Sequence, residues 1–169
     1  YDVAIHLVSL DHHQSNQEPN LVNSVNVMPV WNLLEAFKRK STLSKFIYFS
    51  TIHVYGPLPL EAIDETYTPN PQLPYALTHL LAENICNYYN DTSNINCVNL
   101  RLSNSYGRPC FEDNNCWWLV VNDFCRSAFF EKRIVLRSNG SALRDFIHYK
   151  DIFNAIQILI DSKKDISAN

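Results

Sequence analysis

Apolar residues along the chain recur in two alternating patterns: short uninterrupted runs, and longer stretches with a helical period. The short runs predict buried strands at VAIHLV (3–8), KFIYFS (45–50), INCVNLRLS (95–103) and RIVLR (133–137). The longer stretches predict helices at residues 21–40, 75–89, 117–130 and 151–160, with a kink or a helix start near Pro29. Because strands alternate with helices, we expect an α/β fold with a parallel sheet and helices on both of its faces.

Polar or proline-rich segments separate these elements. Residues 9–20, 57–74 and 104–115 have no apolar period and are predicted to be loops. RDFIHY (144–149) is predicted to be a short extended piece, and Asp151 suits the N-terminal end of the last helix.

Length, charge and cysteine usage limit the possible classes of protein. A chain of 169 residues suits one domain. Its net charge is −3 and it has no run of basic residues, so the sequence offers no positively charged surface for binding nucleic acid or an anionic membrane. No apolar stretch has the length of a membrane span. The five cysteines never form a CxxC pair, which favours reduced thiols in the cytoplasm. The adjacent His12 and His13 lack accompanying ligands, so no metal site is expected.

Two features of the sequence suggest that it belongs to a longer protein. The chain begins at Tyr1 rather than at a methionine, directly before an apolar strand. It contains only three glycines, Gly56, Gly107 and Gly140, so neither G-x-G-x-x-G nor a P-loop can be formed. We therefore expect a fragment without a glycine-rich phosphate loop of its own.

Six segments carry a family likeness. They are YDVAIHLVS, NVMPVWNLLEA, FIYFSTIHVYG, PYALTHLLAE, RLSNSYGRP and RDFIHYKDI. In this order they resemble motifs of the extended short-chain dehydrogenase/reductase family, which contains NAD-dependent nucleotide-sugar epimerases and dehydratases. The resemblance implies the second half of a Rossmann-type doubly wound parallel sheet with part of a small substrate-binding domain. Residues 1–107 would be a partial NAD(P)-binding domain holding strands four to six, and residues 108–169 a mixed segment with part of the substrate region and the last Rossmann elements.

The same resemblance assigns candidate catalytic residues. Tyr75 takes the place of the family's catalytic tyrosine, and Thr51 that of the serine or threonine that hydrogen-bonds the same sugar oxygen. A free phenol has a pKa of about 10, so the family's lysine, one helical turn later, favours the phenolate by its charge. Here that position is His79, whose imidazole has an ordinary pKa of about 6.5 and is mostly neutral at pH 7.

Cofactor and substrate contacts also follow from the resemblance. It places Leu7, Ser9 and Asn26, with Tyr75 and His79, along a bound NAD or NADP. The expected partner is a nucleotide-diphosphate sugar, with a homodimer as a further expectation. The residues expected to contact the nucleotide-diphosphate sugar are His53, Asn104 and Arg144. Arg144 is included because a guanidinium can bind a diphosphate with two hydrogen bonds.

The neighbours of Thr51 bear on the reaction. Family 4,6-dehydratases carry acidic residues just after the threonine, and here those positions are Ile52 and His53. A 4-epimerase needs only the tyrosine and threonine, because the 4-keto sugar turns over and the same hydride returns to its other face. The sequence therefore favours an epimerase, or a reductase, over a typical dehydratase. The replacement of the lysine by His79 keeps open a non-catalytic nucleotide-sugar-binding relative, or an inactive fragment.

Overall fold

The computed structural model describes residues 2–40, 43–111, 113 and 115–162, and it divides into two compact units. One unit runs to Leu102 and takes in the last described residues of the chain, and the second is Ser103–Leu159. The change between them falls five residues before the boundary that the sequence suggested at residue 107.

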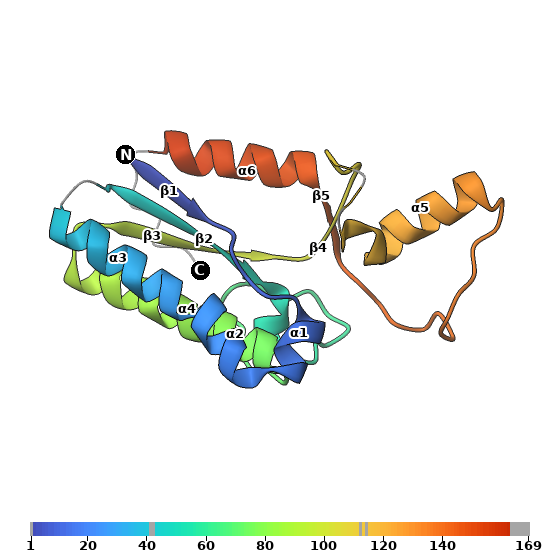
Figure 1. The fold of residues 1–169 in the computed structure, drawn as a ribbon, viewed down its shortest axis with the longest axis horizontal. Coiled ribbons are helices and arrows are strands. Elements are labelled where there is room, and N and C mark those ends of the chain that lie inside the picture. Colours follow the sequence, from blue (N-terminus) through green and yellow to red (C-terminus); the bar gives the residue numbers. More distant parts are fainter. Residues whose placement is uncertain (1, 41–42, 112, 114, 163–169) are drawn as a thin grey trace. The chain divides into compact units, whose positions relative to one another are not determined.

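The first unit is built on a three-stranded sheet. Its strands are β1 (Val3–His6), β2 (Lys45–Thr51) and β3 (Asn96–Leu102), all parallel, in the order β1-β2-β3 (Figure 1). The expected parallel sheet is confirmed, although β1 ends two residues earlier than predicted. As the middle strand, β2 is buried along nearly its whole length, which explains its uninterrupted apolar run.

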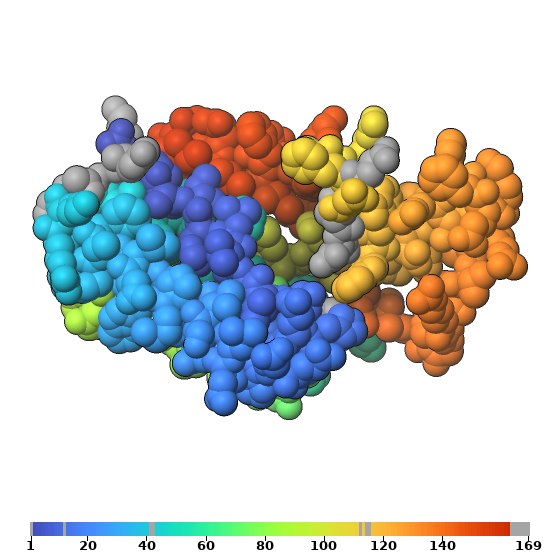
Figure 2. Space-filling view, viewed as in Figure 1, coloured from blue at the N-terminus to red at the C-terminus, as the bar shows by residue number. Residues whose placement is uncertain are grey.

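Four helices accompany this sheet: α1 (His12–Gln17), α2 (Pro19–Asn26), α3 (Met28–Lys40) and α4 (Pro74–Thr92). Helices α3 and α4 run along one face of the sheet in Figure 1, and α2 and α3, blue to cyan, form much of the surface seen in Figure 2. The predicted helix 21–40 is interrupted at Val27, and Pro29 lies in the first turn of α3, where its missing N–H is tolerated. The core between the helices and the sheet consists of Val27, Val30, Leu34, Leu43, Phe46, Tyr48, Ala82, Ile85, Cys86, Tyr89, Ile95 and Cys97.

The prediction of a loop across residues 9–20 is wrong in part, because α1 lies inside it. Its sequence is polar throughout and gives no apolar period. The helix begins because Asp11 caps it: the Asp11 carboxylate accepts a hydrogen bond from Gln14 N at 2.9 Å.

The end of β2 is shaped by a short 3-10 helix. This helix, η1 (Ile52–Tyr55), begins at Thr51, whose hydroxyl oxygen accepts from His53 N at 3.3 Å. Gly56 follows with φ of 72°. A side chain at Gly56 would lie 2.1 Å from the carbonyl oxygen of Asn70, so the turn and the loop behind it require glycine.

The second unit contains two short parallel strands, β4 (Asn104–Tyr106) and β5 (Phe146–His148). It also holds η2 (Asn115–Trp118), α5 (Val120–Phe130) and most of α6 (Tyr149–Asp161). Two predictions are corrected here. Residues 104–106 were expected in a loop and form a strand, whereas 133–137 were expected as a strand and are irregular and exposed. In the described part of the chain, no helix has both the length and the apolar character that crossing a membrane demands.

Candidate active site

Tyr75 and Thr51 are brought together at the carboxyl end of β2. Tyr75 lies in the first turn of α4, which begins at Pro74, and Thr51 is the last residue of β2. The Thr51 hydroxyl lies near enough to the Tyr75 phenol to lower its pKa, and so does the hydroxyl of Ser9, which follows β1. Ligands of α/β sheets bind outside the carboxyl ends of the strands, which is where this hydroxyl cluster lies.

His79 lies one helical turn after Tyr75, and its ring meets the tyrosine edge-on. The ring centroids are 4.5 Å apart with an interplanar angle of 64°. Only 2% of His79 is exposed. Its Nδ1 lies 2.8 Å from the Tyr48 hydroxyl oxygen and its Nε2 lies 3.1 Å from the Ser9 hydroxyl oxygen. Both ring nitrogens are therefore engaged inside the protein.

Burial makes His79 a neutral group. Loss of solvent lowers the pKa of His79 to about 4, and charge on His53 or His6 would oppose its protonation further. Burial also raises the pKa of Tyr75, with a smaller contribution from the negative charge of Asp11. The hydroxyls of Thr51 and Ser9 act in the opposite direction, because they can donate to a phenolate. At pH 7 His79 supplies hydrogen bonds to this site and no positive charge.

His53 lies beside Tyr75. Its side chain is exposed, and its ring stands edge-on to the Tyr75 ring with centroids 6.2 Å apart. The histidine suggested for substrate contact is therefore a neighbour of the tyrosine. Its backbone N–H also helps to hold Thr51.

The three residues expected along a cofactor have different surroundings. Leu7 is 61% exposed just beyond β1, and Ser9 is partly buried beside His79. Asn26 is fully buried: its Oδ1 accepts from Leu10 N at 2.8 Å, and its Nδ2 donates to the Thr78 hydroxyl at 3.1 Å. Asn26 therefore connects the segment after β1 to α4. Because it is fully buried, it supports this segment rather than offering a surface to a cofactor.

Asn104 and Arg144 both belong to the second unit. Asn104 starts β4, and its side-chain amide donates to the carbonyl of Asp145 at 3.0 Å. Arg144 is exposed and donates to the carbonyl of Leu143 at 2.8 Å. The two residues therefore lie near one another at the β4–β5 pair.

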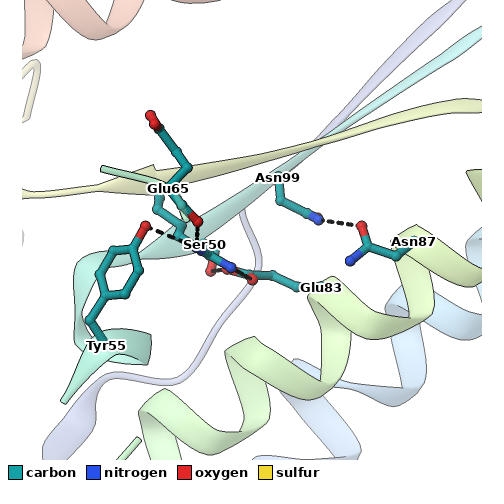
Figure 3. Close-up of polar contacts among 7 residues, drawn as sticks. Ser50, Tyr55, Glu65, Glu83, Asn87 and Asn99 are labelled. Atoms are coloured by element: carbon teal, nitrogen blue, oxygen red, sulfur yellow. Dashed lines mark hydrogen bonds and ion pairs between the residues drawn. The ribbon is translucent and has the colours of Figure 1, made fainter. Parts of the chain in front are cut away.

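A buried ionic network supports the site, and sequence reasoning missed it. Glu83 lies one turn after His79 on α4 and accepts from the Ser50 hydroxyl, next to Thr51. Arg101 on β3 grips the Glu83 carboxylate with distances of 2.6–3.2 Å and donates to the Tyr55 hydroxyl at 2.9 Å. Figure 3 shows Ser50, Tyr55 and Glu83 converging, with the Asn87–Asn99 contact beside them.

A signal for this network exists in the sequence. Tyr75, His79 and Glu83 are spaced by four residues and so lie along one face of α4. Tyr48 and Ser50 alternate with apolar residues on β2 and so share one face of that strand. The polar stripe on the helix and the polar pair on the strand contact one another through Tyr48–His79 and Ser50–Glu83.

The sequence of this chain was compared with models of known protein families. Residues 1–169 match the model of the NAD dependent epimerase/dehydratase family. The chain belongs to this family. The match covers every segment in which the sequence motifs were found.

Three members illustrate the likeness. The structure of UDP-glucuronic acid 4-epimerase from Bacillus cereus, in complex with UDP-glucuronic acid and NAD, is 28% identical, with a TM-score of 0.83 over 99% of this chain and 52% of that one. UDP-N-acetylglucosamine 4-epimerase from Methanobrevibacter ruminantium M1 is 26% identical, with a TM-score of 0.86 over 96% of this chain and 52% of that one. The dTDP-D-glucose 4,6-dehydratase of Dictyostelium discoideum is 24% identical over 94% of this chain and 38% of its own length. The chain thus spans between about a third and half the length of these relatives.

Proposed function

We propose that the protein containing this chain converts a nucleotide-diphosphate sugar with NAD or NADP, most simply by epimerisation through a 4-keto intermediate in the cytoplasm. Tyr75 removes the proton of the sugar hydroxyl, and Thr51 hydrogen-bonds the same oxygen. A bound nicotinamide would supply the acceptor, and then the donor, of the hydride at the sugar carbon. The relatives support this reading, since two of the similar solved structures are 4-epimerases of UDP-sugars.

The observation that carries the proposal is the meeting of Tyr75 and Thr51. Their hydroxyls come from different elements, α4 and β2, and lie close enough at the carboxyl edge of the sheet for Thr51 to lower the pKa of Tyr75. A proton acceptor and a hydroxyl donor on one substrate oxygen are what the removal of an alcohol proton requires. In the first unit, the exposed His53 beside Tyr75 is the side chain we assign to substrate binding. In the second unit, the family motifs assign this role to Asn104 and to the exposed Arg144.

The residues after β1 suit one side of a dinucleotide. Leu7 and Val8 are 61% and 59% exposed and offer an apolar surface to a flat ring, directly before the Ser9 hydroxyl. Asn26 holds this segment in place through Leu10. Leu7 and Ser9 are therefore the residues we assign to the nicotinamide half, together with Tyr75. The family position of His79 suggested a cofactor contact, but His79 is buried with both ring nitrogens bonded to Tyr48 and Ser9, so we assign it a supporting role behind Ser9.

The proposal is tested by Tyr75→Phe and Thr51→Val in the intact protein, with UDP-sugars as substrates. Tyr75→Phe should lower kcat by roughly 10²–10⁴-fold, the usual contribution of a general base, and Thr51→Val by a smaller factor. The partly exposed Tyr67 provides a control, because Tyr67→Phe removes a phenol hydroxyl outside this cluster. Full turnover by Tyr75→Phe would refute the assignment of the base.

A second candidate function is a non-catalytic sugar-nucleotide binder, and the neutral His79 favours it. No cation stands beside Tyr75 in the neutral state of His79, and burial raises the pKa of the phenol, which disfavours the phenolate that a general base requires. A binder would retain UDP-sugar affinity in Tyr75→Phe and would never form reduced nicotinamide in a single turnover. Detectable reduced nicotinamide in the unaltered protein would decide for the enzyme.

A homodimer is also part of the proposal. Trp31 on α3 and Tyr88 on α4 stack with centroids 6.4 Å apart, and both are about half exposed. Leu77 and Leu81 add further exposed apolar surface on α4, which is typical of a protein–protein contact. Sedimentation of the intact protein and of Trp31→Asp tests this: the variant should be a monomer, and an unchanged mass would exclude this face.

A further inference from the structure

We propose that Tyr48 is a positioning residue that sets the tautomer of His79 and thereby fixes the Ser9 hydroxyl beside Tyr75. For its effect on turnover this inference rests on the proposed function, and for the tautomer it stands on the geometry alone. The chain of contacts runs from Tyr48 through both ring nitrogens of His79 to Ser9, with distances of 2.8 and 3.1 Å.

The tautomer follows from the hydrogens available along the chain. The Ser9 hydroxyl donates its single hydrogen to the Leu10 carbonyl at 2.8 Å, so its oxygen is an acceptor toward His79. His79 Nε2 therefore carries the ring hydrogen. Nδ1 is then an acceptor, and it receives the hydrogen of the Tyr48 hydroxyl.

The opposite tautomer leaves a buried donor unused. With the hydrogen on Nδ1, the Tyr48 hydroxyl would become the acceptor and its own hydrogen would need another partner. Tyr48 is 1% exposed, and among the residues that the structure describes its hydroxyl bonds to His79 alone. A buried hydroxyl hydrogen without an acceptor is unfavourable, so Tyr48 selects the Nε2–H form.

The consequence reaches Tyr75 through Ser9. The Ser9 oxygen is held by His79 Nε2–H, and the same hydroxyl is within reach of the Tyr75 phenol. When Tyr75 loses its proton, the Ser9 hydrogen can turn from the Leu10 carbonyl to the phenolate, as the Thr51 hydroxyl also can. A phenolate held by two hydroxyls gains part of the stabilisation that a neighbouring cation would give. Tyr48, which has no contact of its own with a substrate in this scheme, acts only by orienting His79.

The groups facing the chain are consistent with a neutral imidazole. Tyr48 packs against His6 with ring centroids 6.0 Å apart, Tyr75 faces His79, and His53 of η1 lies against Tyr75. Positive charge on His53 or His6 would lower the pKa of His79. The charge of Asp11 acts on Tyr75. The negative charge of Glu83 acts on Tyr48, but neither ring nitrogen of His79 hydrogen-bonds to a carboxylate among the described residues. Burial, the largest influence on the pKa of His79, favours the neutral ring.

The test is the tautomeric state of His79 in the intact protein, read from two-bond proton–nitrogen correlations of ¹⁵N-labelled histidine at pH 7. The His79 signals are assigned by their loss in His79→Gln. We expect the Nε2–H form in the unaltered protein and in Ser9→Ala, because the donor to Nδ1 remains in both. Tyr48→Phe should populate the Nδ1–H form. Tyr89→Phe is the matched control: it removes another buried phenol hydroxyl of the same core, one bonded to Glu35, and should leave His79 unchanged.

Three results would overturn the proposal. They are an Nδ1–H or imidazolium form in the unaltered protein, an unchanged Nε2–H form in Tyr48→Phe, and a switch of tautomer in Ser9→Ala. If Tyr48→Phe does not fold, the unaltered protein and Ser9→Ala still decide. Turnover is the second measurement. Tyr48→Phe should lower kcat about tenfold, as a rise of about one unit in the pKa of Tyr75 would, and should leave KM little changed. The curve of kcat against pH should move to higher pH. If the unaltered protein and all variants show no turnover but the tautomers are as expected, the proposed function is refuted and the role of Tyr48 in setting the tautomer stands.

Discussion

The hydroxyl oxygen of Tyr48 lies 2.8 Å from Nδ1 of His79, deep in the core between β2 and α4. The contact places a neutral imidazole one helical turn from Tyr75, at the position where the family motif has a lysine. Where the family's lysine would place a positive charge near the Tyr75 phenol, this chain has a neutral ring that forms hydrogen bonds to Tyr48 and Ser9.

The first prediction concerns stability below neutral pH. The pKa of His79 is about 4 in the folded protein, below its ordinary 6.5, so between these values the unfolded chain binds more protons than the folded one. Stability should therefore be fully present above pH 6.5 and fall as the pH drops to 4. The difference between these two pKa values corresponds to roughly 3 kcal/mol. His6, whose pKa is also lowered by burial, adds a change of the same sign.

Urea unfolding at several pH values measures this dependence. His79→Gln retains hydrogen-bonding groups and cannot be protonated, so its stability should depend less on pH between 6.5 and 4.5. If the two proteins lose stability in parallel across this window, His79 is charged or exposed in the folded state, and its placement in the core is wrong.

The second prediction concerns the missing positive charge. In His79→Lys an ammonium group would stand beside the Tyr75 phenol and favour its ionised form. The curve of kcat against pH should move toward lower pH by about one unit or more relative to the unaltered protein. His79→Met serves as the neutral control of similar length, and its curve should show no such movement. Identical curves for the lysine and methionine variants would mean that the charge has no access to Tyr75.

The third prediction concerns the buried pair of Glu83 and Arg101, whose side chains are 1% and 7% exposed. Glu83→Gln should cost roughly 3–5 kcal/mol, because the Arg101 guanidinium would remain buried without its counter-charge. Arg39→Gln is the comparison, since it breaks an ion pair whose arginine is 76% exposed, and it should hardly change the midpoint of urea unfolding. Equal effects of the two substitutions would show that solvent reaches the Glu83 pair.

The sequence predicted the parts of this fold that local pattern controls. KFIYFS is an apolar run because β2 is the middle strand, and the helical period of residues 75–89 became α4. RIVLR has the same composition as a strand, yet Ile134, Val135 and Leu136 are each more than half exposed. An apolar run forms a strand only where a neighbouring strand pairs with it, and pairing is decided by residues far away in the sequence.

The proximity of the candidate site residues could be predicted to a similar extent, whereas their roles remain predictions. Tyr75 and Thr51 follow from motifs, and the structure brings them together. The partners of His79 could not be foreseen, because Tyr48 and Ser9 lie 31 and 70 residues away and reach it through the packing of α4 on the sheet. β4 was missed for the same reason: its three residues become a strand by pairing with Phe146–His148.

The last prediction concerns Gly56, which closes the turn that holds Thr51. Its φ is 72°, and an added Cβ would lie 2.1 Å from the backbone oxygen of Asn70, an atom that cannot swing aside as a flexible side chain could. Gly140 also has φ of 72°, but the nearest atom to an added Cβ is Leu136 Cδ1 at 3.8 Å. Gly140→Ala should therefore carry only the backbone strain, about 1 kcal/mol. Gly56→Ala carries this strain and the clash, roughly 3 kcal/mol in all.

Thermal unfolding of both alanine variants separates the two effects. Because relief of the clash at Gly56 must move η1 or the segment at Asn70, we also expect Gly56→Ala to displace the Thr51 hydroxyl from Tyr75 and to lower kcat, whereas Gly140→Ala should leave turnover unchanged. Equal destabilisation by the two substitutions would show that the loop at Asn70 yields without cost. The close approach would then contribute nothing to holding Thr51, and its position would depend on β2 alone.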